Sequence, residues 1–280
     1  MDYDPVKDRL GSFFWKSPLR TRVFYRALDA VFLRAWYVRR ALRRIARAHP
    51  PGEPFRVLDA GTGFGQYAYW LVSRFPEAEV LAVDVKRDYL ERAAAFMART
   101  PYRYRVRFAE QDLTAPMAAE AAFDLCLSVD VMEHIEDDRA VFRNFARVLR
   151  PGGHVVINTP SDQGGSDAAH EGESFIGEHV RDGYAPADLA ARLREAGLEV
   201  VEWTYTYGRY GSAAWRLLVK QPIRLLSRSV LLAPVLVPYY AAVGPLGLAL
   251  NAADVHAEKP TGTGLLMVAR RPAGTVPAAG

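Results

Sequence analysis

Short apolar runs alternate with longer amphipathic segments between residues 56 and 159. The apolar runs predict five buried strands, at residues 56–60, 79–85, 104–110, 125–129 and 154–158. The segments between them predict helices, in which apolar side chains recur at three- and four-residue spacing. Alternating strands and helices are typical of an α/β fold with a parallel sheet covered on both faces. Ligands of such sheets bind beyond the carboxyl ends of the strands, so we expect the functional site there.

The first predicted strand ends in a glycine-rich turn that follows an acid, Asp59-Ala-Gly61-Thr62-Gly63-Phe-Gly65. The spacing is G-x-G-x-G, whereas dinucleotide-binding turns have G-x-G-x-x-G. A pyrophosphate would gain nothing from Asp59, but a ligand with an ammonium group would. Asp84 ends the second strand, where a carboxylate can accept both hydroxyls of a ribose, and Asp112 follows the third, where it can accept an adenine amino group. Together these residues predict a site for a cationic amino-acid nucleoside.

This set of motifs resembles the class I S-adenosylmethionine-dependent methyltransferases, in the small-molecule branch similar to the ubiquinone methyltransferases. The resemblance rests on residues 57–63, 83–84, 123–135, 149–153 (the turn before the fifth strand) and 178–184, and resumes near Gly264. It implies S-adenosylmethionine as the cofactor and a doubly wound, mostly parallel seven-stranded sheet whose last strand is antiparallel. The expected cofactor-binding residues are Asp59, Gly61, Thr62, Gly63, Asp84, Val85, Asp112, Leu113, Ser128 and Val129.

His134 is the candidate catalytic residue. It follows the fourth strand, near the expected position of the transferable methyl group, where an imidazole could accept a proton from a hydroxyl nucleophile. The alternative is that His134 caps the following helix. His179 and Tyr184 are candidate substrate contacts, with a structural role as the alternative. The histidines and acids are too scattered to predict a metal site, and Cys126 lies among apolar neighbours, which predicts a core residue.

The composition is that of a folded soluble protein, since half of the 280 residues are apolar and 24% are charged. The net charge of +4 is unevenly distributed: residues 1–50 contain 12 Lys and Arg against four Asp, which leaves a net charge of −4 for the remainder. This asymmetry differs from the uniformly basic surface of a nucleic-acid-binding protein, so we expect no nucleic acid partner. The first residues contain no apolar run of the signal-peptide type, which predicts a cytoplasmic protein.

The basic N-terminal segment has apolar residues at helical spacing: Leu28, Phe32, Ala35, Val38, Leu42 and Ile45. Its arginines lie largely on the opposite side. Two interpretations fit this pattern: a helix that packs on the domain as a lid over the cofactor, or a surface helix attracted to anionic lipid. Aromatic and basic residues just upstream, Phe13, Phe14, Trp15 and Lys16, favour the second interpretation.

A second basic, apolar segment lies between the sixth and seventh predicted strands, at residues 198–206 and 264–270. Residues 229–253 carry no charge over 25 positions, which is long enough to cross a bilayer. A single crossing is excluded because the seventh strand must return beside the sixth. The segment therefore predicts a helical hairpin that covers the substrate site or enters one leaflet, and its basic residues at every fourth position (Arg216, Lys220, Arg224, Arg228) suit phospholipid headgroups. A buried subdomain or a dimer interface is the alternative.

We therefore divide the chain into a basic amphipathic helical cap (1–50), a cofactor-binding methyltransferase core (51–205), an apolar helical insertion (206–262) and the last core strand with the tail (263–280). The expected function is methyl transfer from S-adenosylmethionine to an apolar or lipid-like small molecule, with peripheral contact to the inner face of the membrane. Two alternatives are a soluble O-methyltransferase whose insertion is a substrate lid, and a non-catalytic membrane-associated adaptor. Asp59 and the glycine spacing argue against an NAD-dependent oxidoreductase.

Overall fold

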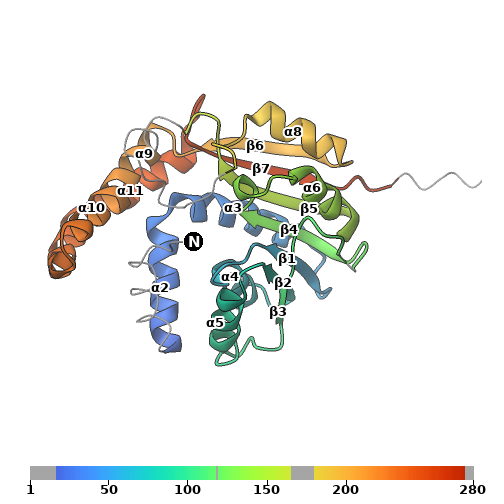
Figure 1. Cartoon of the computed structure of the whole chain (residues 1–280), viewed down its shortest axis with the longest axis horizontal. Helices are drawn as coiled ribbons and strands as arrows, with labels where there is room; N and C mark the ends of the chain where they lie inside the picture. Colours follow the sequence, from blue (N-terminus) through green and yellow to red (C-terminus); the bar gives the residue numbers. More distant parts are fainter. Residues whose placement is uncertain (1–16, 118, 165–179, 275–280) are drawn as a thin grey trace, which may run out of the picture.

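A seven-stranded sheet forms the centre of the computed structural model, which describes residues 17–117, 119–164 and 180–274 (Figure 1). The strand order is β3-β2-β1-β4-β5-β7-β6, and β7 runs antiparallel to both of its neighbours while the other pairs are parallel. This arrangement confirms the predicted doubly wound, mostly parallel sheet. The strands are β1 (Phe55–Ala60), β2 (Ala78–Asp84), β3 (Val106–Glu110), β4 (Phe123–Val129), β5 (Leu149–Pro160), β6 (Glu199–Thr206) and β7 (Gly264–Arg270).

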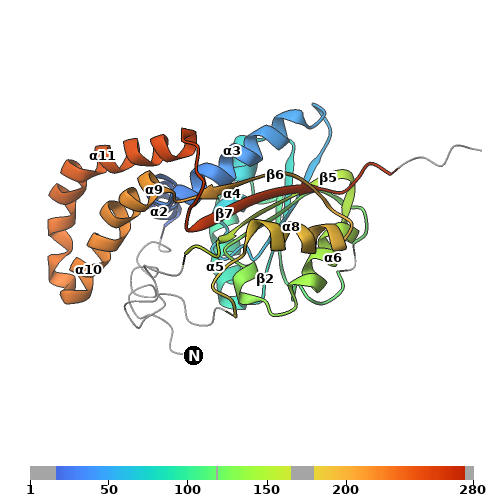
Figure 2. The same ribbon diagram turned by 90° about the horizontal axis from the view of Figure 1, so that it is seen from above.

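Helices cover both faces of the sheet, as Figures 1 and 2 show. Helices α3 (Leu33–Ala48), α4 (Gln66–Arg74) and α5 (Arg87–Met97) contribute to one apolar cluster, and α6 (Asp138–Val148) and α8 (Pro186–Glu195) contribute to the other. Successive residues of β1 enter opposite clusters: Val57 joins the first and Leu58 the second. The apolar runs in the sequence thus reflect strands that are buried on both sides.

The strand ends differ slightly from the prediction. Strand β3 begins at Val106, two residues later than expected. Helix α6 ends at Val148, but the glycines that were expected to form a turn lie inside β5, which begins at Leu149. The strand continues through them because Gly152, at a φ of 82°, donates its N–H to the carbonyl of Arg271 at 2.8 Å.

The described part of the N-terminal cap, from residue 17 onward, contains two helices where one continuous helix was predicted. Helix α2 (Pro18–Val31) ends at Phe32, whose extended backbone (φ −87°, ψ 111°) separates it from α3. The apolar side of α3 packs on the domain, since Leu33, Val38 and Leu42 are fully buried. The alternative in which this helix lies at a lipid surface is therefore wrong, and the aromatic residues 13–15 that favoured it lie outside the described residues.

The insertion is a helical hairpin, as predicted, and it projects from the body of the molecule (Figures 1 and 2). Its outgoing arm contains α9 (Arg209–Trp215), the π-helical turn η2 (Arg216–Lys220) and α10 (Gln221–Arg228). A 3₁₀ turn, η3 (Val230–Val235), leads into the returning helix α11 (Leu236–His256). The most apolar 18-residue window of the segment Leu231–His256 has a mean hydropathy of 1.6, and only 6% of that window is buried. The hairpin is therefore not a subdomain buried within the monomer.

Candidate active site

The glycine-rich loop lies at the carboxyl end of β1, between β2 and β4, where the strand order reverses. Gly61, Gly63 and Gly65 have backbone φ values of 78°, 52° and 75°, which residues other than glycine rarely adopt. A Cβ atom added at Gly61 would lie 2.3 Å from Val131 Cγ2, so glycine lets Val131 lie against the loop. A Cβ atom at Gly63 would meet nothing within 4 Å, so the loop leaves open space for a ligand there.

The first two predicted acids lie beside this loop. Asp59 is buried and accepts a hydrogen bond from the Thr62 hydroxyl at 2.6 Å, and burial raises the pKa of Asp59 to about 6. Asp84 accepts the N–H groups of Gly63 at 2.8 Å and Lys86 at 2.9 Å, one on each carboxylate oxygen. Each oxygen retains a lone pair for a ribose hydroxyl. The position of Asp84 is thus compatible with its predicted role.

The remaining predicted residues differ in exposure. Asp112 is exposed, and hydrogen bonds from the hydroxyl and N–H of Thr114 hold its pKa below the usual value. Val85 is 59% exposed just after β2, whereas Leu113 is buried in the core beneath Asp112. Asp112 and Val85 are therefore accessible to a ligand, whereas the side chain of Leu113 packs in the core.

Two buried polar atoms at the ends of β4 and β5 have no hydrogen-bond partner among the described residues. They are Ser128 Oγ and Asn158 Oδ1, on residues that are 0% and 3% exposed. Ser128 of β4 pairs with Ile157 of β5, and its neighbour Val129 pairs with Asn158. Buried polar groups are normally hydrogen-bonded, so a bound polar ligand is a natural partner for these atoms. This observation fits the predicted roles of Ser128 and Val129.

A cluster of charged residues lies next to these atoms, beyond β4. Arg34 Nε and Asp130 Oδ2 are 3.0 Å apart, and the other oxygen of Asp130 accepts the Asn158 amide at 3.0 Å. Glu133 is 1% exposed and accepts a hydrogen bond from the Thr159 hydroxyl at 3.0 Å. Burial, together with the negative charge of Asp130, raises the pKa of Glu133 to about 8. A buried carboxyl with a raised pKa, beyond a strand end and beside other charged groups, is a candidate general base.

The sequence reasoning missed Glu133 and Arg34. Glu133 was read only as part of a motif, although an acid three residues after Asp130, beyond a strand end, was a signal that could have identified it. Arg34 comes from the N-terminal cap, 96 positions before Asp130, and nothing in the sequence indicates that the two meet. The cap therefore contributes a side chain to the candidate site.

His134 is the last residue of the 3₁₀ turn η1 (Met132–His134) and is half-buried. The following helix α6 is capped by Asp137, whose carboxylate accepts the N–H of Ala140 at 3.0 Å. The alternative in which His134 caps this helix is therefore wrong. His134 remains a candidate, adjacent to Glu133.

Tyr184 lies in a buried polar network. It is 3% exposed, and its hydroxyl donates to Asp138 at 2.6 Å, while Arg192 donates to the same carboxylate oxygen at 2.5 Å and Arg181 also binds there. Burial alone would raise the pKa of Asp138, but these hydrogen bonds and charges lower it. This placement favours the structural alternative for Tyr184. His179 lies outside the described residues.

The N-terminal cap closes over the glycine loop. The buried Tyr25 of α2 donates its hydroxyl to the carbonyl of Phe64, and Gln66 at the start of α4 donates to Asp29 at 2.5 Å. Phe64 lies between two of the loop glycines, so these hydrogen bonds connect α2 to the loop. The interpretation of the cap as a lid over the cofactor agrees with these contacts.

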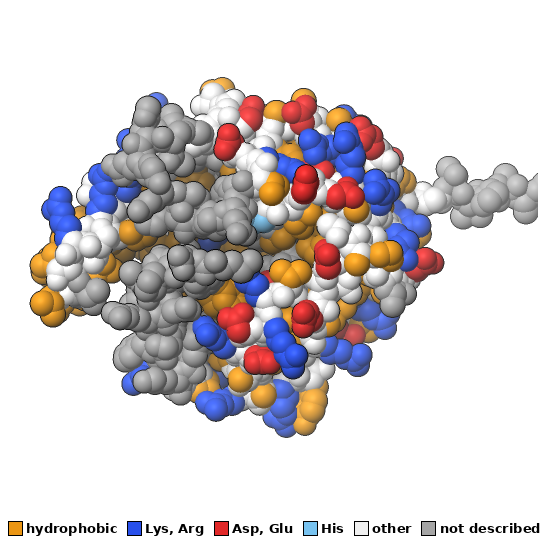
Figure 3. Space-filling model, viewed as in Figure 1, with side chains coloured by type: hydrophobic (Ala, Val, Ile, Leu, Met, Phe, Trp, Pro, Cys, Tyr) orange, Lys and Arg blue, Asp and Glu red, His pale blue; other side chains and the backbone are white. Residues whose placement is uncertain are grey.

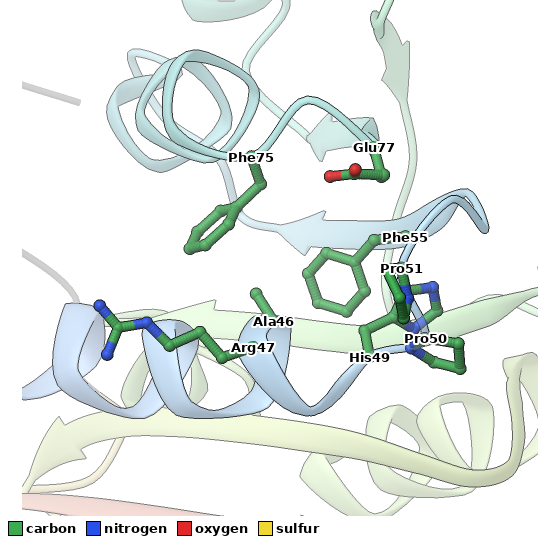
Figure 4. Close-up of a pocket in the computed structure, with 8 residues that line it drawn as sticks. All are labelled: Ala46, Arg47, His49, Pro50, Pro51, Phe55, Phe75 and Glu77. Carbon is green, nitrogen blue, oxygen red and sulfur yellow. The ribbon is translucent and has the colours of Figure 1, made fainter.

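Other hollows in the described structure lie elsewhere. A pocket of about 190 Å³ lies between the end of α3 and the beginning of β1, lined by residues such as His49, Phe55 and Phe75 (Figure 4). It is at the amino end of β1 and so is remote from the glycine loop. Among residues 17–117, 119–164 and 180–274, no group of three His, Cys, Asp or Glu could hold a metal ion. Cys126 is a buried core residue, as predicted, and burial raises its pKa.

Comparison with known proteins gives consistent results. Residues 57–153 match a family described as a methyltransferase domain. The ubiquinone biosynthesis O-methyltransferase of Xanthomonas axonopodis pv. citri (strain 306) is 32% identical over 165 residues, which make up 55% of this chain and 66% of that protein. The chain spans slightly less than two thirds of the length of such curated relatives.

Solved structures show the same fold. A crystal structure provisionally assigned as a sarcosine dimethylglycine methyltransferase from Galdieria sulphuraria has a TM-score of 0.58 and 18% identity, covering 85% of this chain and 84% of that one. Phosphoethanolamine N-methyltransferase 2 of Haemonchus contortus, in complex with S-adenosyl-L-methionine, has a TM-score of 0.55 and 19% identity, covering 89% of this chain and 60% of that one.

The sheet order, the glycine loop and the acids at the strand ends define a Rossmann-like nucleoside-binding domain. With the match of residues 57–153 to the methyltransferase-domain family, they identify a class I S-adenosylmethionine-dependent methyltransferase domain in this chain, as the motifs predicted. S-adenosylmethionine is the cofactor of this class. The open space at Gly63 and the unpartnered Ser128 Oγ fit this cofactor.

Proposed function

We propose that this chain transfers a methyl group from S-adenosylmethionine to an apolar or lipid-like small molecule at a membrane surface. The observation that carries the catalytic part is the buried Glu133, which lies beyond β4 and accepts a hydrogen bond from the Thr159 hydroxyl. Burial and the negative charge of Asp130 raise its pKa. The apolar acceptor is supported by the relatives, which are named for ubiquinone biosynthesis, and by the exposed apolar hairpin.

The cofactor, when bound, supplies an electrophilic methyl group on a sulfonium that is already a good leaving group. The residues of the chain then have two tasks. Asp59, Asp84 and the loop hold and orient the nucleoside, and Glu133 accepts the proton of an acceptor hydroxyl as its oxygen attacks in line. Glu133 must be ionised for this step. His134 is the second candidate for the same proton.

The position of the hairpin supports an apolar acceptor. The insertion leaves the sheet at Thr206, the carboxyl end of β6, and re-enters at Gly264, which pairs with Pro160 at the carboxyl end of β5. Its base therefore lies at the same edge of the sheet as the glycine loop and Glu133. An acceptor dissolved in lipid near the hairpin would lie on the side from which the site is approached.

The test measures S-adenosylhomocysteine formation by mass spectrometry, with the full chain, S-adenosylmethionine and a set of phenols with alkyl or prenyl chains in mixed micelles. If Glu133 is the base, Glu133→Gln lowers the rate by about 10²–10⁴-fold with cofactor affinity nearly unchanged, whereas His134→Asn has a small effect. The wild-type rate rises with pH through about 8, because Glu133 becomes ionised over that range, and the variant loses this dependence.

Glu136→Gln is the matched control, because Glu136 is an exposed acid three residues further along and should leave the rate unchanged. Loss of rate in His134→Asn with retention in Glu133→Gln would transfer the role of base to His134. If the wild type binds the cofactor but methylates none of the apolar phenols, the proposed acceptor class is wrong.

A further inference from the structure

The two arms of the hairpin pack firmly against each other. Tyr239 and Tyr240 of α11 donate their hydroxyls to the carbonyls of Leu217 and Leu218, each at 2.7 Å. Further along α11, a Cβ atom added at Gly247 would lie 2.5 Å from Leu218 Cγ, so this glycine permits close approach of the two arms. The hairpin is therefore a structural unit with one face of α11 already occupied.

The base of the hairpin is fixed to the body of the protein. Asp254 is fully buried and accepts hydrogen bonds from Tyr37 of α3 at 2.7 Å and from the N–H of Gly211 at 2.8 Å. Asn251, 1% exposed, donates to the carbonyl of Ala30 at the end of α2 at 3.3 Å. These buried contacts set the direction in which the hairpin projects relative to the site.

The opposite face of α11 is apolar, and no part of the described residues covers it. Val237 is 74% exposed and Leu246 is 56% exposed, and Leu231 in the preceding turn is 90% exposed. No charged residue occurs between Ser229 and Ala253. An exposed apolar surface of this kind indicates a partner. The exposed residues of this face, the outer face of α11, are Val237, Pro238, Ala241, Ala242, Pro245, Leu246, Leu248 and Ala249.

The other arm supplies positive charge. Basic residues recur at every fourth position along η2 and α10, and no carboxylate occurs from Trp203 to Ala253. In Figure 3, basic and apolar side chains lie side by side on the projecting part. A second copy of the hairpin would bring charges of the same sign together, whereas anionic headgroups are complementary to them. The basic residues are Arg216, Lys220, Arg224 and Arg228.

The distribution of these charges sets the orientation in the membrane. They extend over the whole length of α10, up to Arg228 at its end next to the turn. A hairpin inserted perpendicular to the bilayer would therefore place Arg224 and Arg228 in hydrocarbon, which is costly. A hairpin lying in the plane of the interface keeps every basic residue at headgroup level while the outer face of α11 contacts acyl chains.

We propose that residues 209–256 form an in-plane membrane anchor, in which the outer face of α11 enters one leaflet and the basic residues of η2 and α10 bind anionic headgroups. This proposal rests on the proposed function, because the anchor would hold the protein at the membrane surface where the proposed methyl transfer takes place. It holds the carboxyl edge of the sheet close to the lipid in which an apolar acceptor would be dissolved.

The sole cysteine, Cys126, is buried, so single cysteines introduced elsewhere can be labelled with an environment-sensitive fluorophore. The vesicles contain phosphatidylcholine with phosphatidylserine. When the protein binds them, we expect fluorophores at Val237→Cys and Leu246→Cys to show a blue shift of their emission and equal protection from quenching by iodide. Ser227→Cys, on exposed α10, should stay accessible to iodide, as should the control Tyr104→Cys, on the loop before β3. Deep protection of Ser227→Cys would overturn the in-plane orientation, and no shift at any hairpin position would overturn the anchor.

Vesicle sedimentation tests the headgroup contacts. Replacing Arg216, Lys220, Arg224 and Arg228 by Gln should weaken binding to the same anionic vesicles by roughly fivefold per residue, and the binding of the wild type should fall as salt increases. The matched control replaces four basic residues around α5, which should leave binding nearly unchanged: Arg87, Arg92, Arg99 and Arg103. Equal losses in both variants would show non-specific attraction and overturn the anchor.

The two proposals fail in different ways. If methyl transfer to a micellar phenol is absent but vesicle binding is retained, the proposed function is wrong and the anchor stands. If transfer is present but the wild type ignores anionic vesicles at low salt, the anchor is wrong. A defined dimer that forms through the hairpin and excludes lipid would also overturn it, and would identify a second copy as the occupant.

Discussion

The three acids at successive strand ends have different surroundings, which determine what each can do. Asp59 is buried and has a raised pKa, so it suits a contact that is itself shielded from water. Asp84 is held by two N–H groups that leave its outer lone pairs directed away from the loop. Asp112 is exposed and readily ionised. Of the three, Asp84 combines fixed orientation with access, so it should contribute most to nucleoside affinity.

Asp84→Ala should weaken S-adenosylmethionine binding about tenfold or more, because charge-assisted hydrogen bonds contribute roughly 1.5–3 kcal/mol. Isothermal titration calorimetry measures the affinity, and circular dichroism checks that the fold is retained. Asp88→Ala is a matched control, since Asp88 lies in the exposed first turn of α5 and carries the same charge nearby. Unchanged affinity in Asp84→Ala would remove this residue from the cofactor site.

At the scale of elements, the contact between α11 and η2 determines whether the hairpin is a stable unit. Gly247 is buried against Leu218, whereas Gly244, one turn earlier on the same helix, has nothing within 4 Å of its added Cβ. Both glycines occupy a helix, in which glycine is unfavourable relative to alanine. The two positions therefore separate the effect of packing from the effect of helix propensity.

Gly247→Ala should destabilise the protein by about 1–3 kcal/mol, because the new methyl group overlaps the Leu218 side chain. Gly244→Ala should instead be neutral or stabilising by up to about 1 kcal/mol. Thermal unfolding followed by circular dichroism should show Tm changes of roughly 2–4 °C per kcal/mol, downward for the first variant. Equal Tm values for the two variants would mean that the arms of the hairpin are not closely packed.

At the scale of the whole molecule, the hairpin gives the protein an apolar surface that the rest of the described structure does not cover. Its buried base at Asp254 and Asn251 joins the cap, and the cap joins the candidate site through Arg34 and Asp130. These contacts thus connect the hairpin to the candidate site. In water without lipid, the outer face of α11 should therefore contact other copies of the protein.

Without lipid, the purified protein should therefore associate into a mixture of sizes, with no defined dimer, as concentration rises. It should become monodisperse in a mild non-ionic detergent, as size-exclusion chromatography with light scattering would show. Replacing Leu231, Val237 and Leu246 together by Gln should reduce this association. Replacing Tyr104 and Val201, which are 82% and 51% exposed at other places, should not. A monodisperse monomer without detergent at high concentration would contradict this expectation.

Much of the fold and part of the site were predictable from local patterns. The apolar runs predicted the strands because both faces of a parallel sheet are buried. The glycine loop and the acids at strand ends are local features too, since each follows directly on its strand. The seventh strand must pair beside the sixth, so the insertion has to return to the edge of the sheet that it left. This connectivity and the 25 uncharged residues of the insertion were enough to predict a helical hairpin.

Other features depend on contacts between distant segments, and only the tertiary structure revealed them. The break at Phe32 is one, because the apolar spacing continues through it and packing alone separates α2 from α3. The raised pKa of Glu133 is another, because it arises from the burial of this side chain and from the charge of Asp130 close to it, and tertiary packing sets both. The spacing of apolar residues in the sequence likewise does not show which face of α11 packs against the other arm of the hairpin. Tyr239, Tyr240 and Gly247 pack inward on the other arm, and that packing leaves the opposite apolar face exposed.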